Sequence, residues 1–170
     1  MGAVGAVARA VELGLSTYCQ TEHLWLPERL DPAHEVSLSR EQTAFYLAEL
    51  SRLREVYAER GCAMELVIGV EADWLAGRSE ELVHLCEPYE YVIGSVHYVD
   101  EWPFDDPAVK DEWEERGVDA VWRRYVETWL DMAASDAPIS TFGHPDLVKK
   151  FGYFPSFDVR ECYEAMAQAA

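Results

Sequence analysis

The sequence has few cysteines and no long apolar run. Its four cysteines, Cys19, Cys62, Cys86 and Cys162, are widely spaced and form no CxxC pair, which argues against a disulfide framework or a zinc ribbon. No stretch of about 18 apolar residues is present, and the N-terminus lacks the basic and long apolar regions of a signal peptide. We therefore expect a cytoplasmic protein with no membrane partner.

Basic side chains are also scarce. The chain has 14 Lys and Arg against 32 Asp and Glu, a formal net charge of −18. This balance repels the phosphate backbone of nucleic acids, so a nucleic-acid partner is disfavoured. Hydrophobic residues make up 49% and charged residues 27% of the 170 residues, which is typical of one globular domain.

Helical and strand-like segments alternate along the chain. Apolar spacing and end signals predict helices over residues 4–15, 40–60, 79–86, 117–135 and 157–170. Short apolar runs predict strands over residues 15–23, 64–74, 91–99 and 138–148. This alternation favours an α/β fold with parallel strands.

Residues of metal-ligand type lie near the ends of all four predicted strands: His23, Glu71, His97 and His144. They are separated by 48, 26 and 47 residues, close to one or two multiples of the length of a βα unit, about 25 residues. Ligand sites in such folds gather at the carboxyl ends of the strands. We expect the four side chains to converge on one pocket.

Glu71 is the strongest single indication of a metal site. It stands between Val70 and Ala72 in an apolar run, where a carboxylate is costly to bury unless a cation or another partner compensates it. A carboxylate among imidazoles suits Zn²⁺, Fe²⁺ or Mn²⁺, and it can bridge two ions that activate water and stabilise a phosphoryl group. Each histidine taken alone is more simply explained as a capping or core residue, but the joint pattern favours a metal.

Three further residues are candidates for supporting roles. Ser95 points to the same side of its strand as His97, because side chains repeat every two residues. Asp73 and Asp146 follow Glu71 and His144 by two positions. As hydrogen-bond acceptors they could orient a ligand histidine, and as surface acids they would have no special role.

Four segments carry a family resemblance: AVELGLSTYCQTEHLWLP, IGVEADW, YVIGSVHYVDEWPFD and FGHPDLVKKFG. Together they resemble the polymerase and histidinol phosphatase (PHP) superfamily, and the last two resemble its histidinol-phosphatase branch. The blocks TEH, GVE, SVH and GHPD occur in the expected order and cover nearly the whole chain.

The resemblance implies an incomplete, distorted (β/α)7 TIM-like barrel that holds up to three divalent ions, Zn, Mn or Fe. Glu71 would bridge two ions, His97 and His144 would complete the second position, and His23 would belong to the third. The implied reaction is hydrolysis of a small phosphorylated substrate by metal-activated water. In histidine biosynthesis this reaction converts L-histidinol phosphate to L-histidinol and phosphate.

The chain departs from the family at both ends. The family opens with a strand that carries HxH and closes with one that carries Asp-x-His, whereas this sequence begins at MGAVGAVARA and stops at EAMAQAA. Residues 1–170 are therefore expected to be the central part of a single PHP domain, with little phosphatase activity alone. Its open sheet edges would be sites of association.

Two alternatives remain open. One is a non-catalytic remnant or a metal-binding interaction module. The other is a PHP phosphoesterase that acts on nucleotides, against which the acidic balance and the SVHYVD context argue.

Overall fold

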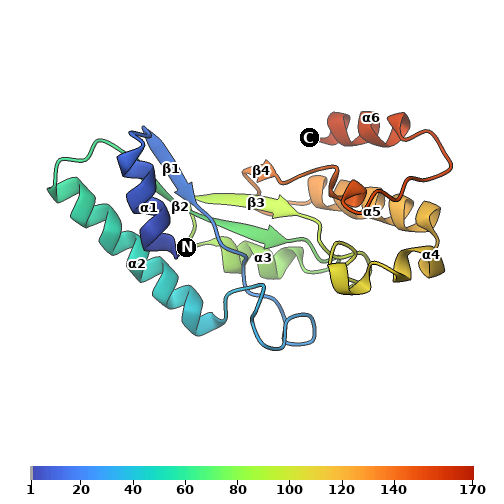
Figure 1. Ribbon diagram of the computed structural model, residues 1–170, viewed down its shortest axis with the longest axis horizontal. Helices are drawn as coiled ribbons and strands as arrows, with labels where there is room; N and C mark the ends of the chain where they lie inside the picture. The colour runs from blue at the N-terminus through green and yellow to red at the C-terminus, as the bar shows by residue number, and fades with distance from the viewer. Residues whose placement is uncertain (1) are drawn as a thin grey trace. The chain divides into compact units, whose positions relative to one another are not determined.

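Helices and strands alternate in the computed structural model, which describes residues 2–170 (Figure 1). The elements are α1 (Ala3–Glu12), β1 (Thr17–Gln20), α2 (Arg40–Glu59), β2 (Glu65–Asp73), α3 (Ser79–Cys86), β3 (Tyr91–Ser95), η1 (Pro107–Val109), α4 (Glu112–Arg116), α5 (Val118–Ala133), β4 (Thr141–Phe142), η2 (Leu147–Lys149) and α6 (Arg160–Ala169). The five predicted helices and the four predicted strands are all present; α3 has the predicted bounds, and the others are shorter than predicted. The residues group into two compact units. Unit 1 runs up to Glu71 and also contains Leu85–Val92, and unit 2 consists of Ala72–His84 and Ile93–Ala170.

Unit 1 is built on the parallel pair β1 and β2. Thr17 lies opposite Glu65, and Gln20 lies opposite Ile68. Helices α1 and α2 are neighbours (Figure 1). The buried hydroxyl of Tyr46, on α2, lies 2.8 Å from the carbonyl oxygen of Gln20 and 3.0 Å from that of Gly69. This hydroxyl therefore links α2 to both strands.

The start of α2 follows from its sequence. Ser39 Oγ accepts a hydrogen bond from the Gln42 backbone N–H at 3.1 Å, and Gln42 Oε1 accepts one from the Ser39 N–H at 2.7 Å. This reciprocal capping box satisfies two donors that the first turn would leave unpaired. Gly61, with φ of 72°, follows the last turn, as predicted for a helix that ends there.

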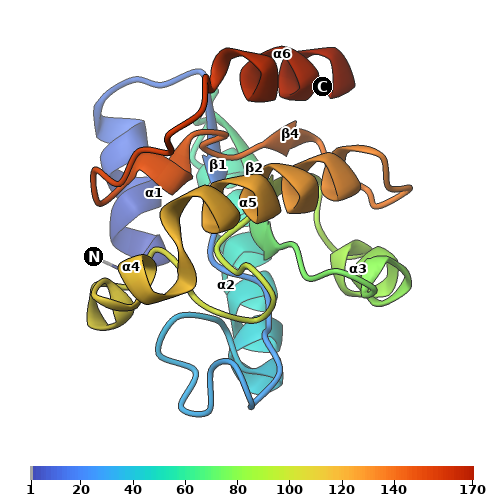
Figure 2. The same ribbon diagram turned by 90° about the vertical axis from the view of Figure 1, so that its right-hand side faces the viewer.

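Unit 2 is built on the parallel pair of β3 and β4. Ile93 lies opposite Thr141, and Gly94 lies opposite Phe142. Helix α5 packs against α4 and α6 (Figure 2). The apolar face of α5 is buried at Val121, Trp122, Tyr125, Trp129 and Met132. Burial of this stripe holds α5 in the core of the unit.

The four strands follow the order β1-β2-β3-β4. Within unit 1, the Glu90 N–H donates to the Ile68 carbonyl at 2.8 Å, and within unit 2 the Trp74 N–H donates to the Ser95 carbonyl at 2.8 Å. The predicted α/β class with parallel strands is confirmed.

None of the helices in residues 2–170 has the length and apolar character needed to cross a membrane.

Two segments differ from the sequence-based prediction. The strand predicted over 138–148 is reduced to Thr141–Phe142, since Pro145 has no N–H for a ladder and η2 begins at Leu147. Between β3 and α5, where the sequence predicted no helix, the structure contains the short helix α4, whose Trp113 is buried. The single-domain organisation of residues 1–170 stays a prediction.

Gly69 gives a test of the close packing around β2. An ideal Cβ on Gly69 would lie 2.5 Å from Cys19 Sγ, 2.9 Å from Thr21 Cγ2 and 3.1 Å from the Tyr91 carbonyl oxygen. We expect Gly69→Ala to lower the free energy of unfolding, measured by urea denaturation, by about 1–3 kcal/mol through overpacking. Cys19→Ala removes the nearest atom, so the double variant should lose less than the sum of the two single losses. Strictly additive losses would contradict this packing.

Candidate metal centre

Unit 1 contributes a histidine and a carboxylate that face each other. His23 and Glu71 are partners in an isolated parallel bridge. The Glu71 N–H donates to the Glu22 carbonyl at 2.9 Å, and the Leu24 N–H donates to the Glu71 carbonyl at 2.8 Å. His23 Nε2 lies 3.8 Å from Glu71 Oε2, with side chains 29% and 20% exposed. The imidazole and the carboxylate therefore lie beside each other and remain accessible to solvent.

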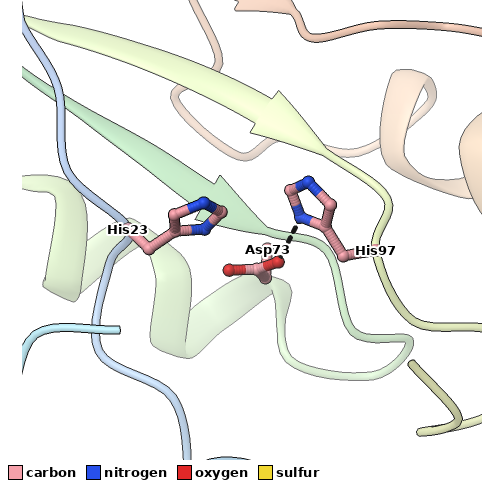
Figure 3. Close-up of side chains that lie close together, drawn as sticks. All are labelled: His23, Asp73 and His97. Carbon is pink, nitrogen blue, oxygen red and sulfur yellow. Dashed lines mark hydrogen bonds and ion pairs between the residues drawn. The ribbon is translucent and has the colours of Figure 1, made fainter. Parts of the chain in front are cut away.

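Unit 2 contributes a buried aspartate and a histidine. Asp73 is the last residue of β2, and its Oδ1 lies 2.5 Å from Nδ1 of His97 (Figure 3). The Asp73 side chain is 2% exposed and that of His97 is 14% exposed. His97 lies two residues beyond the end of β3. An ionised carboxylate only accepts hydrogen bonds, so with Asp73 ionised this contact requires the proton of His97 to be on Nδ1.

His144 completes the cluster in unit 2. Its Nε2 lies 3.2 Å from Nε2 of His97, and the two rings meet edge to face with centroids 4.9 Å apart. The Gly143 N–H, just before His144, donates to the Gly94 carbonyl at 2.8 Å. The Tyr125 hydroxyl donates to the His144 carbonyl at 3.3 Å. Burial raises the pKa of Tyr125, so it remains a neutral donor.

The facing nitrogens fit a divalent ion of the zinc type. In the tautomer that carries its proton on Nδ1, His97 has a lone pair on Nε2 directed toward His144. Two nitrogens that each lie about 2.0–2.1 Å from a tetrahedral zinc are about 3.3 Å apart. The observed separation is 3.2 Å. Imidazole with carboxylate is also a donor set that Zn²⁺, Fe²⁺ and Mn²⁺ accept.

The predicted site residues thus fall into two groups. Unit 1 brings His23 to Glu71, and unit 2 brings Asp73 to His97 and His97 to His144. Their roles as metal ligands remain predictions.

Two of the predicted supporting residues are placed differently from Asp73. Ser95 is fully buried, and an ideal Cβ on Gly143 would lie 2.2 Å from its Oγ. Within residues 2–170, Ser95 Oγ has no hydrogen-bond partner. Asp146 is exposed and pairs with Lys149 at 3.4 Å. Support of His144 by Asp146 stays a prediction.

Sequence reasoning missed Tyr125 as a residue of this site. The side chain lies on the apolar face of α5, so its position predicted only core packing. A signal was available, because a buried tyrosine hydroxyl usually finds a hydrogen-bond partner. Its partner, the carbonyl of His144, is 19 residues away in the sequence and is identified only by the fold.

The model of the PHP domain family matches residues 5–170. A probable histidinol-phosphatase from Deinococcus radiodurans is 36% identical to this chain over 146 residues, which are 85% of this chain and 54% of that protein. The chain therefore spans about half the length of this curated relative.

Two solved structures share the fold. The putative histidinol phosphatase of Listeria monocytogenes matches with a TM-score of 0.75 at 19% identity, over 96% of this chain and 69% of that chain. The histidinol phosphate phosphatase of Lactococcus lactis subsp. lactis was solved in complex with zinc, L-histidinol and phosphate. It matches with a TM-score of 0.73 at 21% identity, over 99% of this chain and 62% of that chain. The predicted PHP-type barrel fold, of which this chain covers a part, is confirmed.

The loop that follows His23 is organised by a buried carboxylate. Asp31 accepts hydrogen bonds from the backbone N–H groups of Glu35 at 2.9 Å, Val36 at 3.2 Å and Ser37 at 2.7 Å, and from Ser37 Oγ at 2.8 Å. Burial would raise the pKa of Asp31, but these hydrogen bonds outweigh it and lower the pKa below its usual value.

The same loop is anchored at both ends. Ser37 Oγ accepts a hydrogen bond from the Leu26 N–H at 3.2 Å, and the Leu38 N–H donates to the His23 carbonyl at 3.1 Å. The ordered loop therefore holds the backbone of His23 as well as its own shape.

The depressed pKa of Asp31 has a consequence for stability. The carboxylate stabilises the folded state above its unfolded pKa of about 3.9, and this contribution is lost as the pH falls through the lower folded-state pKa. Asp31→Asn should therefore lower the free energy of unfolding by about 1–3 kcal/mol near neutral pH. The difference in the free energy of unfolding between Asp31→Asn and the wild type should become smaller below about pH 4.

Urea denaturation at about pH 7 and about pH 3.5 measures this difference. Glu35→Gln is the matched control, because the Glu35 side chain is exposed and only its backbone contacts Asp31. An equal loss at both pH values would show that the charge of Asp31 does not stabilise the loop.

Proposed function

Because the chain belongs to the PHP domain family, we propose that it carries the divalent-metal site of a phosphoesterase, with His23, Glu71, His97 and His144 as ligands. The 36% identity to a probable histidinol-phosphatase supports the reaction class. The order of the TEH, GVE, SVH and GHPD blocks supports the ligand set.

The observation that carries the proposal is the pair of facing nitrogens in unit 2. The two imidazole rings meet edge to face, and this arrangement places Nε2 of His97 3.2 Å from Nε2 of His144. Without a metal, a proton on His144 Nε2 can join the two rings. A divalent cation can replace that proton, since both nitrogens then present lone pairs to it.

Each ligand has a distinct part in the proposed site. Glu71 adds the single carboxylate of the ligand set and is the residue suited to bridging two ions. His23, beside Glu71, would serve a further ion. When bound, divalent ions lower the pKa of water and neutralise charge on phosphoryl oxygens.

We further propose a small phosphomonoester, L-histidinol phosphate, as the substrate. The Deinococcus relative is named a probable histidinol-phosphatase, and the Lactococcus structure contains L-histidinol and phosphate. The net charge of −18 disfavours nucleic acids. The weak activity expected of residues 1–170 alone, their association through open edges and the cytoplasmic location stay predictions.

The ligand assignment is tested by zinc affinity. Each of three variants removes a donor atom: Glu71→Gln, His97→Ala and His144→Ala. Loss of a residue that only hydrogen-bonds to a metal ligand lowers metal affinity by ~10–100-fold, so each of these variants should weaken zinc binding by at least that factor. Isothermal titration calorimetry of the metal-stripped chain measures the affinity. His84→Ala is the control, since His84 is exposed on α3. Equal affinities for His84→Ala and His97→Ala would exclude the proposed ligands.

The substrate class is tested by phosphate release from the zinc- or manganese-loaded chain. We expect release from L-histidinol phosphate at least ~10-fold faster than from adenosine monophosphate, abolished by a chelator and by Glu71→Gln. The rate should be low in absolute terms, as the sequence predicts. The reverse order of substrates would favour the nucleotide alternative. Tight metal binding without chelator-sensitive release would favour the non-catalytic module.

A further inference from the structure

Asp73 is a buried carboxylate that the ligand set does not use. Its side chain is 2% exposed at the last position of β2. A carboxylate in such a place is costly unless it is paired. Its Oδ1 lies 2.5 Å from His97 Nδ1 (Figure 3). The other ring nitrogen of His97, Nε2, faces His144.

Two hydrogen bonds of Trp74 hold the backbone next to Asp73 in place. The N–H of Trp74, the next residue, donates to the Ser95 carbonyl at 2.8 Å, which joins the ends of β2 and β3. The Trp74 indole N–H also donates to Asp131 Oδ2 at 3.0 Å. Asp73 and His97 are therefore presented to each other by fixed main chains, and Asp73 has a short side chain with few rotamers.

We propose that Asp73 is a positioning residue, which holds the proton of His97 on Nδ1 and so directs the lone pair of Nε2 toward the metal. This inference rests on the proposed function for the identity of the metal ligands. Asp73 acts through the imidazole ring and does not itself bind the ion. Carboxylates behind ligand histidines fix the tautomer and ring orientation in this way, and their loss costs about 10–100-fold in metal affinity.

Asp73 is distinguished from Asp146 by its surroundings. Both follow a candidate ligand by two residues in the sequence. Asp146 is 57% exposed and pairs with Lys149, so solvent competes for its carboxylate. Asp73 is sheltered from solvent, where a charged hydrogen bond to a histidine is stronger.

The test compares Asp73→Asn and Asp73→Ala with the wild-type chain in two measurements. The first is zinc affinity by calorimetry, for which we expect a loss of ~10–100-fold for Ala and a smaller loss for Asn, which keeps an acceptor oxygen. The second is the ¹⁵N shifts of the His97 ring in the metal-free chain. These should show a proton on Nδ1 in the wild type and a mixture of tautomers in Asp73→Ala.

Asp119→Asn is the matched control. Asp119 also lies in unit 2 and accepts hydrogen bonds from Ser156, away from the histidines. Its removal should leave both zinc affinity and the His97 tautomer unchanged. The five histidines make assignment of the His97 ring practical by comparison with His97→Ala. Thermal melting of each variant shows whether it is folded.

The outcomes separate this inference from the proposed function. A folded Asp73→Ala chain with wild-type zinc affinity, or with an unchanged His97 tautomer, would overturn the positioning role. X-ray absorption of the zinc-loaded Asp73→Asn chain should show the wild-type number of ligands, and a lost oxygen ligand would instead make Asp73 a direct ligand. If the wild-type chain binds no zinc, the proposed function fails, and the tautomer measurement still decides the role of Asp73.

Discussion

The structure depends on the pairing of two carboxylates at the end of β2. Glu71 and Asp73 alternate with Val70 and Ala72, which are almost fully buried, so the strand carries charge into an apolar environment. Such charges are tolerated only with partners, and each carboxylate has a histidine beside it. The backbone hydrogen bonds of Glu71 and Trp74 to neighbouring segments fix the register at which these partners meet, because a slip of one residue would turn both carboxylates to the other face.

Small residues let the neighbouring backbones come close enough for this arrangement. A Cβ on Gly94 would lie 2.8 Å from Ile139 Cδ1, and one on Gly143 would lie 2.2 Å from Ser95 Oγ. Gly143 and Gly94 are joined by a backbone hydrogen bond of 2.8 Å immediately before His144. A strand of two residues can therefore position His144, since close packing and one hydrogen bond replace the longer ladder that the sequence predicted.

Local patterns in the sequence were sufficient to predict the alternation of helices and strands, but not the partners of the candidate histidines. The capping box at Ser39 and the apolar face of α5 are contained in short segments, so they could be predicted. Helix α4 has no such pattern, and its Trp113 is buried by stacking on Tyr153, 40 residues further along. Asp73 and Asp146 had equal sequence signals, and only the fold shows that one is sheltered beside His97 while the other is solvated.

The composition of the proposed ligand set also addresses an electrostatic problem. A phosphomonoester brings roughly −1.5 to −2 charge to a chain whose net charge is −18, and long-range repulsion opposes its approach. Lys149 and Lys150 are each engaged by an aspartate, so their charge is partly cancelled. Neutral imidazoles bind a divalent cation without cancelling its charge, whereas a set of carboxylates would neutralise it. Three histidines with one glutamate would therefore cancel less of the ions' charge than a set of carboxylates would, and this favours the binding of an anionic substrate.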